Sequence, residues 1–193
     1  MSLRLKNIVD ISVYKKVILK DGRVIILKRM TQEDYTKGNN YEYVHKWLSQ
    51  VSKYLLYDFL EEDLDWDKQN FLTSLNNAEN IILGGIYNEK IIAQAKLNVN
   101  VLSPRQRHIG YWSVMIHPEF QNNGLGAYLL NCIEIIATMI GLKRLEAEFI
   151  EENSPAKELY LRKLGYTIEG RKKKAFKLPD GTYIDKTVIG KIL

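Results

Sequence analysis

The feature that most constrains the fold is a polar loop that joins a β-branched apolar segment to a long amphipathic one. Residues 114–117 read Val-Met-Ile-His, Pro118 ends the strand that they predict, and residues 121–126 read Gln-Asn-Asn-Gly-Leu-Gly. From residue 125 to 140, apolar side chains recur at helical spacing until Gly141. Such an arrangement leaves unpaired backbone amides at the positive end of a helix, where an anion is stabilised. We therefore expect this loop to hold a pyrophosphate.

Two common nucleotide-binding loops do not fit these residues. A Gly-x-Gly-x-x-Gly motif would need a third glycine at the position of Leu129. The Gly-Lys-Ser/Thr of nucleoside-triphosphate loops is absent as well. The expected ligand therefore carries a pyrophosphate but needs no hydroxyl that binds magnesium.

The rest of the chain predicts a mixed α and β domain. Asp21-Gly22 lies between two β-branched runs and predicts a hairpin, because this dipeptide accepts the positive φ of a tight turn. Residues 31–77 have helical spacing, with Asp65 as the expected cap of one helix. The further expected elements are strands over residues 81–87, 91–101, 108–116 and 145–150, a helix from Ser154 to Gly165, and a closing hairpin over residues 175–192.

The composition is that of an ordinary folded protein. Of 193 residues, 46% are hydrophobic and 26% are charged, which excludes disordered and fibrous classes. No apolar run approaches the ~20 residues that cross a bilayer, and the N-terminus lacks the apolar centre of a secretory signal. We therefore expect one domain over residues 1–193, in the cytoplasm and with no membrane partner.

The reactive side chains argue against metal and disulfide chemistry. Cys132 is the one cysteine, which excludes an internal disulfide and a metal site built from several thiolates. No second histidine or acid near His117 completes the spacing of a metal site, so no metal is expected.

The net charge of +5 suggests nucleic acid as one class of partner. Basic residues are spread along the chain, however, and only residues 171–174, Arg-Lys-Lys-Lys, form a run. A site for a small anion explains the charge equally well, so nucleic acid is a disfavoured partner.

Residues 121–126 resemble the Gln/Arg-x-x-Gly-x-Gly/Ala signature of the GCN5-related N-acetyltransferases (GNAT), which bind acetyl-coenzyme A. The resemblance continues downstream at residues 153–156 (Asn-Ser-Pro-Ala), at Tyr160 and at residues 164–166 (Leu-Gly-Tyr). Together these motifs are far more specific than the glycine loop alone.

Two further segments resemble one branch of that family. Residues 109–112 (Ile-Gly-Tyr-Trp) and 169–171 (Glu-Gly-Arg) look like the branch that acetylates ribosomal-protein N-termini and polyamines. The similarity covers roughly residues 81–193. The chain before it offers no match.

The resemblance implies an α+β fold with a central mixed, mostly antiparallel sheet flanked by helices. Two parallel strands, one ending at Ile116 and one over residues 145–150, would splay apart and hold the coenzyme. Acetyl-coenzyme A would be the cosubstrate and Tyr160 the general acid. The coenzyme-binding residues that the resemblance implies are Val114, Met115, Ile116, Asn122, Asn123, Gly124, Leu125, Gly126, Ala127, Asn153 and Tyr160.

Acetyl transfer from a thioester to an amine requires a neutral amine, a stabilised oxyanion and a proton for the departing thiolate. A phenol with a pKa of about 10 keeps its proton at pH 7 and can protonate a thiolate whose thiol has a pKa of about 8.5, the role implied for Tyr160. Glu148 shares one face of its expected strand with Glu146 and coincides with the base used in part of the family. Ordered water is the alternative base.

These observations predict an N-acetyltransferase that moves acetyl directly to a primary amine in a ternary complex. The acceptor is left open between a protein N-terminus, a polyamine and an amino acid, and a homodimer is left open as well. A coenzyme-binding sensor or scaffold of the same fold is the alternative, because Asn122 and Asn123 stand where basic or glycine residues are frequent in the family.

Overall fold

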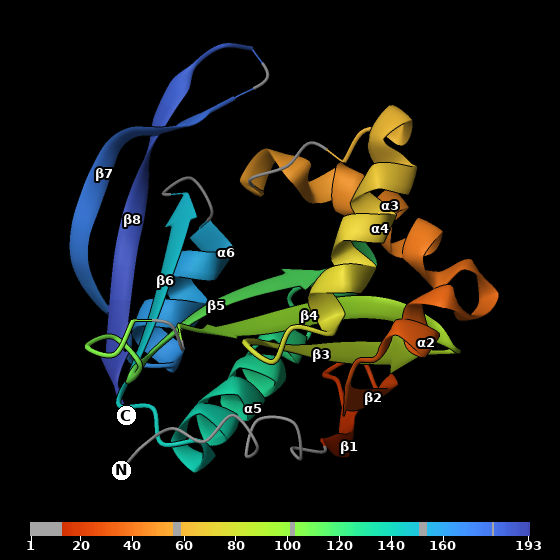
Figure 1. Cartoon of the computed structure of the whole chain (residues 1–193), viewed down its shortest axis with the longest axis horizontal. Helices are drawn as coiled ribbons and strands as arrows, with labels where there is room; N and C mark the ends of the chain where they lie inside the picture. The colour runs from red at the N-terminus through yellow and green to blue at the C-terminus, as the bar shows by residue number, and fades with distance from the viewer. Residues whose placement is uncertain (1–12, 56–58, 101–102, 151–153, 179) are drawn as a thin grey trace.

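The computed structural model describes residues 13–55, 59–100, 103–150, 154–178 and 180–193. Its centre is one sheet with the strand order β1-β2-β3-β4-β5-β6-β8-β7 (Figure 1). The strands are β1 (Tyr14–Ile18), β2 (Val24–Arg29), β3 (Asn80–Tyr87), β4 (Lys90–Val99), β5 (Ile109–Ile116), β6 (Arg144–Ile150), β7 (Thr167–Lys177) and β8 (Tyr183–Ile192). The helices are α2 (Gln32–Thr36), α3 (Asn40–Val51), α4 (Leu64–Leu75), α5 (Leu125–Met139) and α6 (Ser154–Lys157), which continues into a π-helical segment, Glu158–Lys163.

All neighbouring strands of this sheet are antiparallel except β5 and β6. These two parallel strands pair only where Ile109–Tyr111 of β5 faces Arg144–Glu146 of β6. Beyond Tyr111, β5 stays paired with β4 up to Ile116, while β6 stays paired with β8 up to Ile150. The two strands therefore diverge, which confirms the expected mostly antiparallel sheet with a splayed parallel pair.

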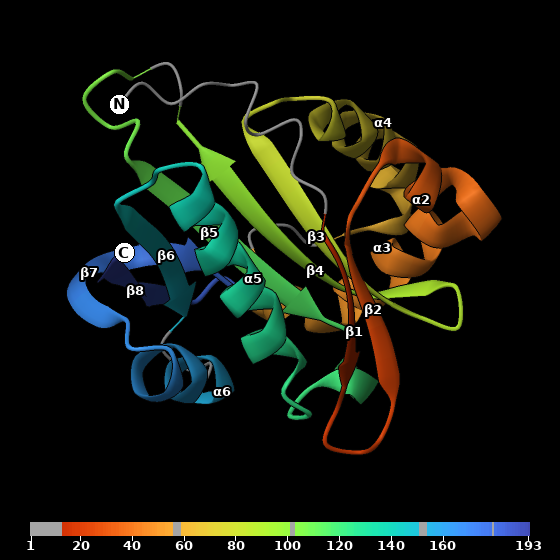
Figure 2. The same ribbon diagram turned by 90° about the horizontal axis from the view of Figure 1, so that it is seen from below.

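Helices cover both faces of the sheet. Figures 1 and 2 show α5 on one face and α2, α3 and α4 on the other. The apolar stripe of α5, including Leu129 and Ile133, packs against a cluster that contains Leu97 and Leu145 of the sheet. Each such fully buried leucine or isoleucine contributes about 1.5–3 kcal/mol to folding. This packing fixes where the N-terminus of α5 lies relative to β5.

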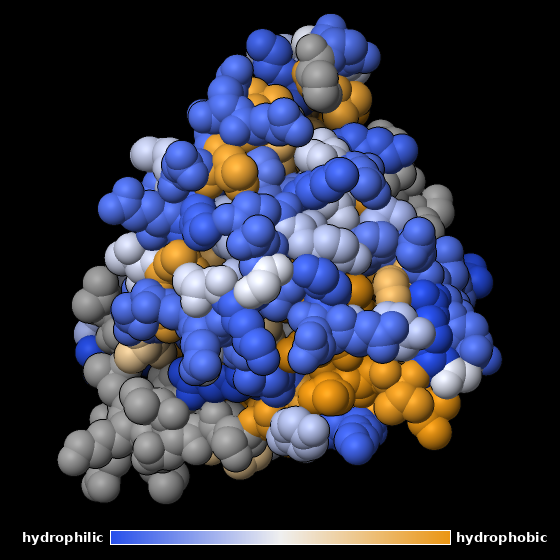
Figure 3. Space-filling model, turned by 90° about the vertical axis from the view of Figure 1, so that its right-hand side faces the viewer, coloured by the Kyte–Doolittle hydropathy of each residue, from blue (hydrophilic) through white to orange (hydrophobic). Residues whose placement is uncertain are grey.

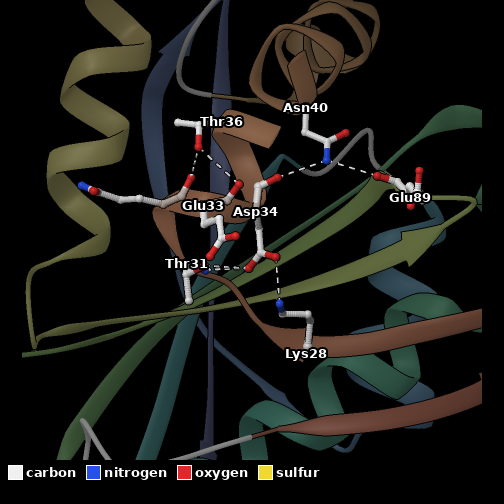
Figure 4. Close-up of polar contacts among 8 residues, drawn as sticks. Lys28, Thr31, Glu33, Asp34, Thr36, Asn40 and Glu89 are labelled. Carbon is white, nitrogen blue, oxygen red and sulfur yellow. Dashed lines mark hydrogen bonds and ion pairs between the residues drawn. The ribbon is translucent and has the colours of Figure 1, made fainter. Parts of the chain in front are cut away.

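Helix α2 is tied to the sheet by polar contacts around Asp34 (Figure 4). The Asp34 carboxylate accepts hydrogen bonds from the Thr31 amide (2.9 Å) and from the Lys28 ammonium of β2 (2.8 Å). The Asn40 side-chain amide donates to the carbonyls of Asp34 (3.0 Å) and Glu89 (3.1 Å). These bonds join α2, the start of α3 and the β3–β4 turn.

Three details differ from the sequence-based expectation. Helix α4 begins at Leu64, with Asp63 as its cap, so Asp65 lies in the first turn, where its charge still favours the helix dipole. The helix that starts at Ser154 widens into a π-helix before Gly165. Strand β7 starts at Thr167 rather than at residue 175, because an edge strand exposed to solvent can be rich in lysine and lacks the apolar alternation of a buried strand.

One edge of the sheet carries exposed apolar side chains. The β1–β2 hairpin leaves Ile18 65% and Val24 49% exposed. Figure 3 shows hydrophobic residues gathered along the lower edge of its view, on the side where this hairpin lies in Figure 1.

Candidate active site

The loop before α5 has the backbone geometry of an anion cradle. Asn122 and Gly124 both adopt the left-handed conformation, with φ of 60° and 91°. Successive turns of this kind direct backbone amides toward one side of a loop. The first bond of the helix runs from the Tyr128 amide to the Gly124 carbonyl (3.2 Å), so helix geometry leaves the amides of Leu125, Gly126 and Ala127 without an intrahelical acceptor. The loop can therefore present several donors to a pyrophosphate.

The two glycines of this loop have different roles. A side chain at Gly124 would meet open space but would be strained by the positive φ. A Cβ at Gly126 would lie 3.0 Å from the Leu159 side chain and 3.3 Å from that of Ile116. Gly126 therefore lets α5 pack closely against the π-helical segment and the end of β5.

The turn between β1 and β2 holds the same loop from outside. The Arg23 guanidinium donates to the Glu119 carbonyl (2.7 Å) and lies 3.8 Å from the centroid of the Phe120 ring. The Lys20 amide donates to the Asn123 carbonyl (3.3 Å). Sequence reasoning missed this contact, because nothing local in the chain links the hairpin to the loop.

Asp21 fixes the Arg23 side chain in this position. Its carboxylate accepts a 2.7 Å hydrogen bond from Arg23 Nε and a 3.1 Å bond from the Arg23 amide. The hydrogen bond from Arg23 lowers the pKa of Asp21. The arginine is thus oriented from one side while its guanidinium stacks on the ring.

The end of β5 directs alternate backbone groups into the divergence from β6. The His117 amide donates to the Ile92 carbonyl of β4 (2.9 Å), and an antiparallel ladder alternates from residue to residue. Met115 therefore directs its amide and carbonyl toward β4, opposite Gln94. Val114 and Ile116 direct theirs away from β4, and the Ile116 carbonyl accepts from the Gln121 side-chain amide (2.9 Å).

Tyr160 lies where β5 and β6 separate. Its ring packs edge-on against Trp112 of β5, with centroids 4.9 Å apart, and against Phe149 of β6, at 5.7 Å. The residue is 8% exposed, and burial raises the pKa of its phenol. It belongs to the π-helical segment, a rare geometry that is frequent at functional sites. The phenol is therefore protonated at neutral pH and held between the diverging strands.

Glu148 lies on the opposite face of β6 from Tyr160. Its neighbours Ala147 and Phe149 pack into the core around α5, so Glu148 faces the other way. Its carboxylate accepts a hydrogen bond from Lys172 of β7 and lies 3.8 Å from the Lys186 ammonium of β8. To receive a proton from a substrate, Glu148 would have to exchange one of these partners.

His117 connects the loop to α3. Its ring lies 5.9 Å from the rings of Tyr43 and Trp47 and 5.8 Å from that of Phe120. Its Nδ1 accepts from the Glu119 amide (3.3 Å). Burial lowers the pKa of His117, against the opposing effect of Glu119, so the imidazole is neutral at pH 7. His117 is thus a packing and capping residue.

The residues expected from the sequence are thus distributed over several elements. The loop from Asn122 to Ala127, the end of β5 and Tyr160 adjoin one another through the contacts of Gly126 and Trp112. Asn153 lies outside the described residues. Within the described part of the chain, no three histidine, cysteine or acidic side chains gather as metal ligands.

The fold is that of a large family of coenzyme-dependent enzymes. The model of the acetyltransferase (GNAT) family matches residues 41–166, more than half of the chain. The chain therefore belongs to the GNAT family, whose general activity is acetyl transfer from acetyl-coenzyme A. No curated protein sequence matches it significantly.

Solved structures support this assignment. A GNAT-family acetyltransferase from Streptococcus pneumoniae is 26% identical, with a TM-score of 0.68, over 88% of this chain and 99% of that one. A ribosomal-protein-S5-alanine acetyltransferase from Vibrio fischeri is 18% identical, with a TM-score of 0.71, over 95% and 97% of the two chains. A ribosomal-protein-alanine N-acetyltransferase from Brucella melitensis is 19% identical, with a TM-score of 0.71, over 86% and 99%. The last two comparisons show the fold alone.

Membrane insertion through a helix finds no support in the described ranges. Every helix there is too short or too polar to cross a bilayer.

Proposed function

We propose that this protein transfers the acetyl group of acetyl-coenzyme A to a primary amine, directly and within a ternary complex. The observation that carries the proposal is the position of Tyr160, which packs against Trp112 of β5 and Phe149 of β6 where these strands diverge. A protonated phenol between the two strands suits the protonation of a leaving thiolate.

The coenzyme would lie along the loop and the end of β5. Backbone amides from Asn122 to Ala127 would bind its pyrophosphate, as their left-handed turn and free helix amides favour. The outward groups of Val114 and Ile116 would bind the pantetheine arm and the thioester. The backbone contact that the resemblance implies for Met115 would not form, because its amide and carbonyl point toward β4. Contact between Asn153 and the pantetheine stays a prediction.

The reaction begins with a neutral amine. An amine with a pKa of about 10.4 is neutral only about 0.04% of the time at pH 7, which corresponds to about 4.6 kcal/mol. A base, either Glu148 or an ordered water, therefore receives a proton from the amine. The neutral nitrogen then attacks the carbonyl carbon of the thioester.

The tetrahedral intermediate forms and breaks down next to the end of β5 and Tyr160. An outward amide at the end of β5 would stabilise the oxyanion. When the carbon–sulfur bond breaks, the nitrogen loses its second proton to water, and the thiolate takes the phenolic proton of Tyr160, which regains a proton from solvent. The products are the acetylated amine and coenzyme A.

Direct transfer, without an acetyl-enzyme, is supported by the state of the one cysteine. Cys132 is half-buried on α5, and burial raises the pKa of its thiol. A thiol is a poor nucleophile, because the thiolate is the reactive form. The amine therefore attacks the coenzyme thioester itself.

The test measures coenzyme binding and turnover separately. Acetyl-coenzyme A should raise the melting temperature, because a ligand that binds only the folded state stabilises it. Thiol release should then depend on the acceptor in a panel of N-terminal peptides, amino acids and spermidine. If acetyl-coenzyme A raises the melting temperature but no acceptor gives thiol release, the protein is better described as a coenzyme-binding sensor. An affinity for DNA or RNA that falls steeply with salt would favour nucleic-acid binding.

The remaining features of the protein stay predictions. One domain over residues 1–193 and a cytoplasmic location are expected from the sequence. The exposed apolar side chains of Ile18 and Val24 are consistent with a homodimer. Sedimentation of the purified protein would determine its oligomeric state.

A further inference from the structure

A half-buried lysine on β4 has no counter-charge. Lys96 lies between Ala95 and Leu97, which pack into the core around α5, so its side chain is on the opposite face of the sheet. In the described ranges of the chain, no hydrogen bond or ion pair reaches its ammonium group. Burial lowers the pKa of Lys96, and no charged group offsets this effect.

The nearest positions on the same face are all uncharged. Ile82 of β3 and Ser113 of β5 flank Lys96 in the strand register. Gln94 and Asn98 precede and follow it on its own face of β4. The side chain therefore lies on a neutral, partly apolar surface.

Two other basic residues that lie on this face of the sheet are paired with acids. Lys28 lies 2.8 Å from Asp34 (Figure 4), and Arg144 lies 2.6 Å from Glu146. Glu148, which points from β6 to the same face as Lys96, is already engaged by its two lysines. These three acids are thus already paired with other basic residues.

The position of Lys96 relates it to the reaction site. Ser113, its register partner, lies two residues beyond Tyr111, where the pairing of β5 with β6 ends. Tyr160 and α5 occupy the other face at this point. An amine that approaches the thioester from the face opposite Tyr160 would therefore pass Lys96.

We propose that the ammonium group of Lys96 binds a carboxylate of the acceptor, which makes the substrate class an amine that also carries a carboxylate. This inference rests on the proposed function. An ammonium group without a counter-ion on a partly desolvated surface attracts an anion strongly and repels a polycation. The acceptor is then an amino acid or a peptide with an acidic residue beside its N-terminus, rather than a polyamine.

A purely structural role for Lys96 predicts a different outcome. A lysine stem can cover apolar surface while its ammonium group reaches water. Replacement would then alter stability but leave the choice between acceptors unchanged. The discriminating quantity is the preference between matched acceptors, measured in the wild type and in variants.

The experiment compares kcat/KM for acceptors with and without a carboxylate. One set pairs L-amino acids with their α-amides, and the other pairs amidated peptides that carry Asp or Asn at position two; spermidine is the polycation. The ratio within each pair is compared between wild type and Lys96→Gln, so the intrinsic reactivity of the two amines cancels. The set of pairs whose ratio changes in Lys96→Gln shows whether the acceptor is a free amino acid or an acidic peptide.

The expected result is a preference for carboxylate acceptors that falls at least tenfold in Lys96→Gln and is largely retained in Lys96→Arg. Lys90→Gln is the matched control, because Lys90 lies on the same strand and donates to the Gly38 carbonyl (3.1 Å). It should keep the wild-type ratio.

Three outcomes would overturn the inference. The kcat/KM ratio between acceptors with and without a carboxylate could be unchanged in Lys96→Gln, it could change equally in Lys90→Gln, or no acceptor with a carboxylate could be acetylated. Acetylation of spermidine alone would contradict only this inference. Absence of acetyl-coenzyme A binding in the wild type would instead contradict the proposed function.

Discussion

The guanidinium of Arg23 lies 3.8 Å from the centroid of the Phe120 ring and donates a 2.7 Å hydrogen bond to the neighbouring carbonyl of Glu119. It thereby ties the β1–β2 turn to the loop that begins α5. The backbone bond from Lys20 to Asn123 (3.3 Å) acts at the same place. A loop that must present its amides to a pyrophosphate gains affinity when it is already ordered.

Arg23→Ala should therefore weaken acetyl-coenzyme A binding. Loss of the ring contact and the charge-assisted hydrogen bond should remove about 1–2 kcal/mol, or roughly 5–30-fold in Kd. Isothermal titration calorimetry measures the change. Lys20→Ala is the control, because it removes a charge from the same turn but keeps the backbone bond. An equal loss in both variants would point to charge rather than to loop order.

The contacts of Arg23 with Glu119 and Phe120 could not be predicted from the sequence. The strand, loop and helix around residue 118 are local, and spacing predicted them. The Arg23 bond to Glu119 joins residues 96 positions apart, and Glu148 meets Lys172 24 positions away. Such contacts depend on which strands become neighbours, which hydrophobic periodicity does not determine.

The role of Gly126 could not be separated from that of Gly124 for the same reason. Both read as glycines of a phosphate loop. In the fold, only Gly124 has positive φ, whereas Gly126 faces Leu159, which belongs to a different element. Tyr160 was singled out only through the family resemblance, because a tyrosine at helical spacing is usually a core residue.

Gly126→Ala should lower the free energy of unfolding by about 1–3 kcal/mol, because the added methyl group overpacks the contact with Leu159. Urea denaturation measures this loss. The double variant Gly126→Ala/Leu159→Ala should recover part of it, since it relieves the 3.0 Å contact. Gly124→Ala serves as the comparison, because it introduces backbone strain while its added Cβ meets open space. If the loss of unfolding free energy in the double variant equalled the sum of the losses in Gly126→Ala and Leu159→Ala, the packing explanation would be wrong.

His117 should make stability depend on pH. Burial lowers its pKa in the folded state, so below about 6.5 the unfolded state binds more protons and the free energy of unfolding falls. This contribution is fully present above that pH and is lost as pH falls through the folded pKa. Glu119 and Arg23 are the charged neighbours that modify it. His117→Asn should flatten the decline between pH 7 and 5 in urea denaturation, and a decline as steep as in the wild type would contradict this assignment.

Tyr160→Phe should lower kcat by about 100-fold or more while Kd for acetyl-coenzyme A stays the same, because only the proton donor is lost. The phenylalanine ring keeps the edge contacts with Trp112 and Phe149, so the melting temperature should change little. Thiol release with the best acceptor gives kcat, and calorimetry gives Kd. Tyr183→Phe, on β8 and 56% exposed, is the matched control and should retain full activity. Undiminished kcat in Tyr160→Phe would mean that water, rather than this phenol, protonates the leaving thiolate.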